Sequence, residues 1–297
     1  MCACPTPLPP VAPPSPSAVR ALVGALLPQE SDLRVEPVDE GGEHSTWWVG
    51  ERYVLRLTLD GEAAVRQRRE VALRAAIQPY VPVGVPVSVA AGDWTPGLAC
   101  TVDSRLPGES AERRSVGPEG ERDLAGMLRG LRALPPGRVS ALGLPVREPR
   151  ALDELRRSAD EALVRLTAHG EAPAARVPPH EPGATEPPAP LTAVLLHNDL
   201  KGEHLLVSSA GRVSGVLDWA DAVVGDPAED VAGLALSIGA AATERVTVAA
   251  GLTPEVFRRG LLLARYDTAI RLADRVEGRD DSPLPLLRAQ LDRAWAG

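Results

Sequence analysis

Hydrophobic and polar positions follow two different periods along the chain. Between residues 17 and 106, short apolar runs separated by turn residues predict strands. The clearest run is Tyr53–Leu59, in which every second residue is apolar, so Arg56 faces away from the core side of its strand. After the break at Leu106-Pro107-Gly108, apolar residues recur at helical spacing. The pattern therefore predicts a smaller β-rich region followed by a larger, mainly helical one.

Two helices accompany the strands of the first region. Ser17–Leu27 has helical apolar spacing with Ser17 as the expected cap, and Asp60–Ile77, capped by Asp60, carries Glu70. The predicted strands are Leu33–Val38, Thr46–Val49, Tyr53–Leu59, Val85–Ala91 and Leu98–Val102.

The second region is expected to contain five long helices: Glu119–Leu134, Ala151–Thr167, Ala228–Ala241, Pro254–Val276 and Leu284–Ala296. Two proline-rich segments interrupt the pattern, because proline fixes φ and lacks a backbone donor. We expect residues 1–16 to form a flexible leader and Ala172–Pro190 to form a surface loop. The expected domains are thus 1–16, an N-terminal lobe at 17–106 and a C-terminal lobe at 107–297.

Composition narrows the classes of function. The net charge of −8 and the pI near 5.3 argue against a nucleic-acid partner, which requires basic surfaces. The three cysteines form no metal-ligand grouping with histidines and are compatible with a reducing cytoplasm. The sequence shows neither a membrane-spanning apolar run nor a signal peptide, so we expect a cytoplasmic protein with no membrane partner.

Candidate chemistry concentrates between residues 193 and 230. An apolar strand, Ala193–Leu196, leads into a polar loop, and the strands His204–Val207 and Val213–Leu217 then form a hairpin. Folding the hairpin about Ala210-Gly211 places His204 opposite Leu217 or Asp218. The two side chains then lie at one end of the hairpin, close to Asp199. Phosphoryl transfer requires such a convergence, with one carboxylate to orient a hydroxyl group and other ligands to hold Mg²⁺.

These residues also carry a family resemblance. His197-Asn198-Asp199, His204 and Asp218-Trp219 resemble the aminoglycoside phosphotransferase and choline kinase superfamily, and Gly225-Asp226-Pro227 with Asp230 is similar to its antibiotic kinases. The resemblance extends over residues 17–297. It implies an α+β, bilobal, protein-kinase-like fold and phosphoryl transfer from ATP or GTP with Mg²⁺.

The resemblance also assigns roles in the polar loop. It implies that Asp199 is the catalytic base or hydroxyl-orienting residue, that His197 belongs to the catalytic motif, and that Asp230 braces the loop. Lys201 either touches the γ-phosphate or is a solvated loop lysine. Asp218 is the implied principal metal ligand.

His204 stands where most members have Asn. Because Mg²⁺ prefers oxygen ligands, two roles remain open for this side chain: the metal or phosphate site, or a supporting hydrogen bond. Within the superfamily, His at this position is familiar in macrolide phosphotransferases and aminoglycoside 2''-kinases, which favours an antibiotic substrate.

For the nucleotide, the resemblance places Arg56 where phosphate-binding Lys usually stands, with Glu70 as its ion-pair partner. Arginine is always charged and matches phosphate oxygens in a bidentate way. An interlobe salt bridge is the alternative for this pair. The remaining expected nucleotide contacts are Gly42, Ser45 and Thr46 in the covering loop, and Thr101, Asp103 and Arg105 in the hinge.

The leading hypothesis is an O-phosphotransferase that acts on an aminoglycoside, macrolide or nucleoside antibiotic and so confers resistance. A metabolic kinase for a sugar, amino alcohol or nucleoside is the alternative, and His204 also leaves open a nucleotide-binding pseudokinase. A protein kinase is disfavoured, because the first hairpin lacks G-x-G-x-x-G, Asp218-Trp219-Ala220 replaces D-F-G, and no A-P-E follows.

Overall fold

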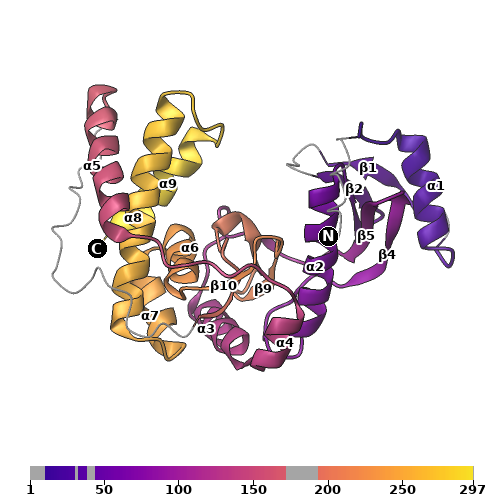
Figure 1. Ribbon diagram of the computed structural model, residues 1–297, viewed down its shortest axis with the longest axis horizontal. Coiled ribbons are helices and arrows are strands. Elements are labelled where there is room, and N and C mark those ends of the chain that lie inside the picture. Colours follow the sequence, from indigo (N-terminus) through magenta and orange to yellow (C-terminus); the bar gives the residue numbers. More distant parts are fainter. Residues whose placement is uncertain (1–10, 31–32, 39–43, 172–192, 297) are drawn as a thin grey trace, which may run out of the picture. The chain divides into compact units, whose positions relative to one another are not determined.

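The computed structural model describes residues 11–30, 33–38, 44–171 and 193–296. The chain divides into two compact units, drawn in Figure 1. The first comprises Met1–Gln78 and Val85–Leu106, and the second comprises Pro79–Gly84 and Pro107–Gly297.

The first unit contains a five-stranded antiparallel sheet in the order β1-β2-β3-β5-β4. Its strands are β1 (Val35–Pro37), β2 (His44–Val49), β3 (Tyr53–Thr58), β4 (Ser88–Thr95) and β5 (Leu98–Ser104), and its helices are α1 (Pro16–Leu26) and α2 (Gly61–Ile77).

Strand alternation gives this sheet two different faces. Leu55 and Leu57 of β3 are fully buried in a core that α1 completes through Val19 and Val23. Arg56 lies between the two leucines and faces the other side, where its guanidinium group meets Glu70 of α2. The predicted orientation of Arg56 is therefore confirmed.

The two helices of this unit begin at side-chain caps. Asp60 caps α2 as predicted, because its Oδ1 accepts the Ala63 N–H at 2.8 Å. The prediction for α1 was wrong by two residues: Ser15, not Ser17, is the cap, and its Oγ accepts the Ala18 N–H at 3.3 Å. Pro16 can then occupy the first helical position, where no backbone donor is needed.

Strand β4 begins later than predicted, at Ser88 rather than Val85. Pro86 has no N–H to donate to a sheet, and the backbone at Gly84 instead forms an isolated parallel bridge with Gly215. The apolar run at 85–91 therefore enters the sheet only from Ser88 onward.

The second unit contains two small antiparallel sheets, one pairing β10 with β7 and the other in the order β6-β8-β9. The strands are β6 (Glu109–Ser110), β7 (Val194–Leu196), β8 (Leu205–Val207), β9 (Val213–Val216) and β10 (Val223–Gly225), and a 3₁₀ turn, η1 (Gly202–His204), precedes β8.

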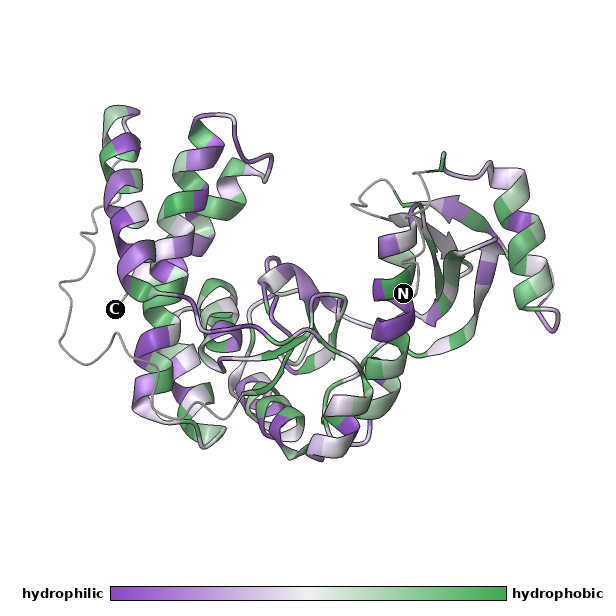
Figure 2. Ribbon diagram, in the orientation of Figure 1, coloured by the Kyte–Doolittle hydropathy of each residue, from purple (hydrophilic) through white to green (hydrophobic). Residues whose placement is uncertain are grey.

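Helices make up most of the second unit. Its long central helix is α8, which α5, α6 and α9 all contact, as the left part of Figure 1 shows. These helices carry both hydrophobic and hydrophilic residues along their length (Figure 2), and the apolar ones meet in a shared core. The helices are α3 (Pro118–Ala133), α4 (Pro136–Ala141), α5 (Leu152–Ala168), α6 (Ala228–Ile238), α7 (Ala240–Ala249), α8 (Pro254–Val276) and α9 (Leu284–Trp295).

One predicted helix is shorter than expected, and the helix that follows it was not predicted. The expected helix Ala228–Ala241 ends at Ile238 because Gly239 adopts φ 83°, and α7 starts directly after it. The predicted bounds of α8 are confirmed. Most of the predicted leader, residues 1–10, and the whole predicted loop Ala172–Pro190 lie outside the described residues, while Pro16 belongs to α1.

None of the helices in the described part of the chain has the length and apolar character needed to cross a bilayer.

Candidate active site

The polar loop after β7 is held by a carboxylate from α6. Both oxygens of Asp230 accept backbone N–H groups, Oδ2 from His197 at 3.1 Å and Oδ1 from Asn198 at 2.7 Å. Asp230 is 1% exposed, and burial raises its pKa to about 7, against the lowering effect of the two N–H groups. The loop is thus fixed to α6, although the two are about thirty residues apart in the sequence.

His197 lies fully buried beneath this loop. Its Nε2 contacts the Leu217 carbonyl at 2.8 Å, and its Nδ1 accepts the Asp199 N–H at 3.2 Å. Because a carbonyl only accepts, Nε2 carries the proton and the ring is neutral. Burial, with a smaller contribution from His204, lowers the pKa of His197 to about 4. Its ring also packs edge-on against Trp219, with centroids 4.5 Å apart.

Four side chains converge where the loop meets the hairpin. Lys201 Nζ lies 3.0 Å from Asp199 Oδ1, while the His204 ring lies between two carboxylates, with Nδ1 3.5 Å from Asp199 Oδ2 and Nε2 3.6 Å from Asp218 Oδ2. The predicted hairpin register is confirmed, since the Leu217 N–H donates to the His204 carbonyl at 2.9 Å. The sequence-based expectation that Asp199, His204 and Asp218 meet is therefore confirmed.

The backbone is unusual at two points of this cluster. Among the described residues other than glycine, only Asn198 and Asp218 have positive φ, at 69° and 56°. Asn and Asp tolerate the left-handed region better than other side chains, but the conformation still costs free energy. Asn198 precedes Asp199, and Asp218 lies beside His204, so the strain is concentrated at the candidate site.

Close packing also fixes the loop from α6. A Cβ on Gly233 would lie 3.0–3.1 Å from three backbone atoms of Leu200, so only glycine allows this approach. In addition, Ser237 Oγ donates to the Leu200 carbonyl at 2.6 Å. The residue after Asp199 is thus held on two sides by one helix.

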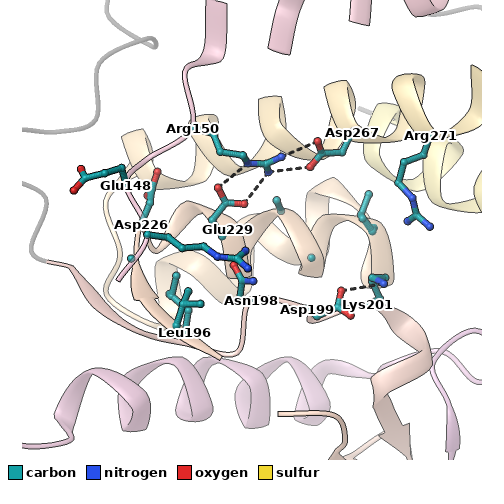
Figure 3. A pocket seen from close by; sticks show the side chains of 16 residues that line it. Glu148, Arg150, Leu196, Asn198, Asp199, Lys201, Asp226, Glu229, Asp267 and Arg271 are labelled. Carbon is teal, nitrogen blue, oxygen red and sulfur yellow. Dashed lines mark hydrogen bonds and ion pairs between the residues drawn. The ribbon is translucent and has the colours of Figure 1, made fainter. Parts of the chain in front are cut away.

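Asp199 and Lys201 line a cavity of about 470 Å³ that lies within the second unit. This volume is in the usual range for small-molecule sites. Figure 3 shows the Asp199–Lys201 ion pair in one part of the cavity and Arg150 between Glu229 and Asp267 in another. The lining comes from the polar loop, β10, α6, α8 and residues 147–150.

In the first unit, Arg56 and Glu70 form the expected ion pair. Arg56 Nη1 lies 2.8 Å and 3.0 Å from the two oxygens of Glu70, whose side chain is 1% exposed. Arg74, one helical turn after Glu70, lies 3.7 Å from the same carboxylate and donates to both oxygens of Asp103 at 3.1 Å. The pair is therefore part of a buried network between α2 and the sheet.

Thr101 and Asp103, two expected hinge contacts, belong to the same network. Thr101 Oγ1 accepts from Gln67 Nε2 at 2.9 Å and donates to Asp103 Oδ2 at 3.2 Å. Both side chains are almost fully buried, so neither is exposed to a ligand. Arg105 differs, because it is exposed and its guanidinium group stacks over Trp48 at 4.4 Å.

The covering-loop residues are divided by strand alternation. Thr46 is the cross-strand partner of Arg56 and shares its face of the sheet. Ser45 faces the opposite side, where its Oγ accepts from Trp47 Nε1 at 2.9 Å. The structure thus brings Thr46, but not Ser45, to the face that carries Arg56, and Gly42 lies outside the described residues.

Three residues of these networks were not predicted. Arg74 could have been found from its spacing, because residues four apart share a helix face and Glu70 was already a candidate. Gln67 lies on the same face by the same argument. Arg150 has no such signal, since its partners Glu229 and Asp267 are far away in the sequence.

Comparison with known proteins gives the same picture. The family model described as "Phosphotransferase enzyme family" matches residues 34–259. Viomycin phosphotransferase from Streptomyces vinaceus is 42% identical over 64 residues, which are 20% of this chain and 22% of that protein. The match therefore covers less than a quarter of this curated relative's length.

Solved structures match over nearly the whole chain. The GDP and kanamycin complex of APH(2'')-IIIa has a TM-score of 0.68 at 19% identity, covering 93% of this chain and 97% of that one. Macrolide 2'-phosphotransferase type I has a TM-score of 0.62 at 19% identity, covering 96% and 99%. These matches confirm the expected α+β kinase-like fold. Because the family model covers most of the sequence, the chain belongs to the phosphotransferase enzyme family.

Proposed function

We propose that this phosphotransferase transfers the terminal phosphoryl group of ATP or GTP to a hydroxyl group of a small-molecule antibiotic. One observation carries the proposal. Asp199, with Lys201 at 3.0 Å, lies at the wall of a cavity large enough for such an acceptor.

Asp199 is assigned the role of hydroxyl-orienting base. Its side chain is 19% exposed, so it is reachable from the cavity while its backbone is held through His197. A carboxylate here can accept the proton of the attacking hydroxyl group. Lys201, 28% exposed, is close enough to Asp199 to move between this carboxylate and an incoming phosphate.

Asp218 and His204 are assigned to Mg²⁺. His204 Nδ1 lies 2.8 Å from the Asp199 carbonyl and must donate to it, so in the neutral ring Nε2 keeps its lone pair on the side of Asp218. The described residues contain no group of three or more His, Cys, Asp or Glu suited to a metal. This agrees with Mg²⁺ bound to nucleotide, which takes few protein ligands and completes its shell with phosphate oxygens and water. When bound, the ion neutralises charge on the transferred phosphoryl group.

His197 and Asp230 are positioning residues in this scheme. Neither is exposed, and both act on the loop backbone. His197 was expected in the catalytic set on the basis of the motif, and its burial supports an indirect role. Neutral His197 keeps the Asp199 N–H and the Leu217 carbonyl satisfied at once.

We assign nucleotide binding to the N-terminal lobe, residues 17–106, and catalysis and acceptor binding to the C-terminal lobe, residues 107–297. Arg56 is proposed as the phosphate ligand, held by Glu70, with Thr46 beside it and the backbone of residues 101–105 as the base contact. GDP in one related structure supports GTP as a donor to test alongside ATP.

The antibiotic acceptor is supported by the relatives, whose names include kanamycin, macrolide and viomycin. The test is nucleotide turnover by the full chain with aminoglycoside, macrolide, nucleoside and peptide antibiotics, each with ATP and with GTP. Turnover with at least one drug, lost in Asp199→Asn and kept in Glu203→Gln, is expected. Glu203 is an exposed carboxylate in the same loop and controls for loss of charge. The absence of turnover with every drug would contradict the antibiotic assignment.

A further inference from the structure

Most of the carboxylates that line the cavity beside Asp199 are already paired with a cationic side chain. Five acidic residues line it: Glu148, Asp199, Asp226, Glu229 and Asp267. The cationic residues that line it are Arg147, Arg150, Lys201 and Arg271. The cavity wall therefore carries both acidic and basic side chains and has little net charge.

Arg150 compensates two of these carboxylates at once. Its nitrogens donate to both oxygens of Glu229 at 2.7 and 2.9 Å, and to both oxygens of Asp267 at 2.8 and 2.9 Å. Figure 3 shows the guanidinium group lying between them. Such bidentate contacts are the strongest that arginine makes with carboxylates. An ammonium group of a ligand would have to displace Arg150 to reach either one.

A third carboxylate, that of Asp226, is paired with a buried arginine. Arg259 Nε lies 2.5 Å from Asp226 Oδ2, and both side chains are 2% exposed. Asp226 Oδ1 also accepts the Ala228 N–H at 2.9 Å. A ligand cation therefore gains little from Asp226, because breaking a buried pair leaves the arginine uncompensated.

A polycationic acceptor needs carboxylates that are not already paired, and this cavity provides few. Burial alone would lower the pKa of Arg150, but its hydrogen bonds with Asp267 and Glu229 hold it above its ordinary value, so the guanidinium keeps its charge. Arg271 also lines the cavity, and its guanidinium group donates to Ser282 Oγ at 2.9 Å and lies 3.4 Å from Asp280 Oδ2.

We infer, resting on the proposed function, that the acceptor of this enzyme is a hydroxylated compound of near-zero net charge, neutral or zwitterionic, rather than a polyamine sugar. Hydroxyl, amide and carbonyl groups of such a compound can form hydrogen bonds with the charged side chains of the wall without breaking their ion pairs. Arg150 is the residue that sets this preference.

The test compares two ligands of one skeleton, kanamycin and its tetra-N-acetyl derivative, in which the ammonium groups have become neutral amides. Calorimetric titration of the full chain measures both dissociation constants. Kanamycin is expected to bind the wild-type chain no more tightly than the acetylated form. Binding of kanamycin at least ten-fold tighter than the acetylated form would overturn the inference.

The variant Arg150→Met uncovers Glu229 and Asp267. It is expected to bind kanamycin at least about ten-fold more tightly than the wild type, the worth of one charge-assisted hydrogen bond, with no such gain for the acetylated form. Arg138→Met, which removes an exposed arginine of α4, controls for net charge. An unchanged affinity of Arg150→Met for kanamycin would overturn the inference, and Arg150→Gln replaces this variant if it does not fold.

Turnover separates this inference from the function on which it rests. Phosphorylation of kanamycin by the wild-type chain would support the antibiotic kinase and overturn the charge preference. Turnover of neutral or zwitterionic acceptors only would support both. If no acceptor is turned over, the proposed function fails, and the two titrations still decide whether the cavity excludes polycations.

Discussion

The pH dependence of stability offers a direct test of how the loop before Asp199 is held. His197 is fully buried and neutral, with its Nε2 donating to Leu217 and its Nδ1 accepting from Asp199. Protonation would place a hydrogen on Nδ1, facing the Asp199 N–H, and would bury a charge. Burial accordingly lowers the pKa of His197 from 6.5 to about 4.

The sign and size of the effect follow from proton linkage. Between pH 6.5 and 4, the unfolded chain holds a proton on His197 that the folded chain does not. The stability contributed by the neutral ring is therefore present above pH 6.5 and is lost as the pH falls through this window. At about 1.4 kcal/mol per pH unit, the loss is about 3 kcal/mol in total.

Asp230 has the opposite dependence. Burial raises its pKa from 3.8 to about 7, so in this range the folded chain holds a proton that the unfolded chain has released. That contribution is complete below pH 3.8 and is lost as the pH rises through 7. Over pH 4 to 6.5 the contributions of His197 and Asp230 to the pH dependence of the unfolding free energy have opposite signs and offset each other.

Urea unfolding of His197→Gln and of the wild-type chain between pH 7.5 and 4 should isolate the contribution of His197. Gln keeps a donor for the Leu217 carbonyl, and any packing cost is independent of pH. The free energy of unfolding of the variant, relative to wild type, should rise by about 3 kcal/mol as the pH falls from 6.5 to 4. Parallel pH curves for His197→Gln and wild type would refute the claim that His197 is buried in its neutral form.

Three further outcomes test the networks around the site. Arg74→Met should lower the free energy of unfolding by about 3 kcal/mol or more, because it leaves the Asp103 carboxylate buried without its arginine and leaves Glu70 with Arg56 alone. Arg68→Met breaks a half-exposed pair with Asp93 and should cost less than about 1 kcal/mol. Equal losses of the free energy of unfolding in urea would contradict this. Arg56→Met should raise the KM for nucleotide at least about ten-fold. Arg56→Lys should raise this KM less, because lysine keeps the positive charge. An unchanged KM in both variants would show that Arg56 does not bind the phosphate. Gly233→Ala should lower kcat about ten-fold or more, because the added methyl group would push the Leu200 backbone next to Asp199. Gly137→Ala in α4, which has open space around the glycine, should leave kcat unchanged. Equal kcat values in the two variants would show that the loop tolerates displacement.

Local signals predicted much of the fold. Asp60 marks the start of α2 because a carboxylate can cap a helix, and α8 begins at Pro254, a residue suited to the first helical turn. The hairpin register followed from its turn, and it brought His204 and Asp218 together. In each case a few adjacent residues decide the outcome.

Other features depend on contacts that no local pattern contains. The break at Gly239 lies in a run of helix formers, where one glycine costs only about 1 kcal/mol and packing decides the outcome. Ser45 and Thr46 were treated alike, although strand alternation puts them on opposite faces once the register is fixed. Arg150 meets Glu229 and Asp267 only in the folded chain.

In the proposed function, Asp199 orients the acceptor hydroxyl group for phosphoryl transfer. The most direct measurement is the single-turnover rate of product formation by the wild-type chain and by Asp199→Asn, with nucleotide affinity measured alongside on the same preparations. We expect a rate about 10² to 10⁴ times lower in the variant, the effect typical of a positioned base, with nucleotide affinity preserved. An unchanged rate in Asp199→Asn would contradict this role.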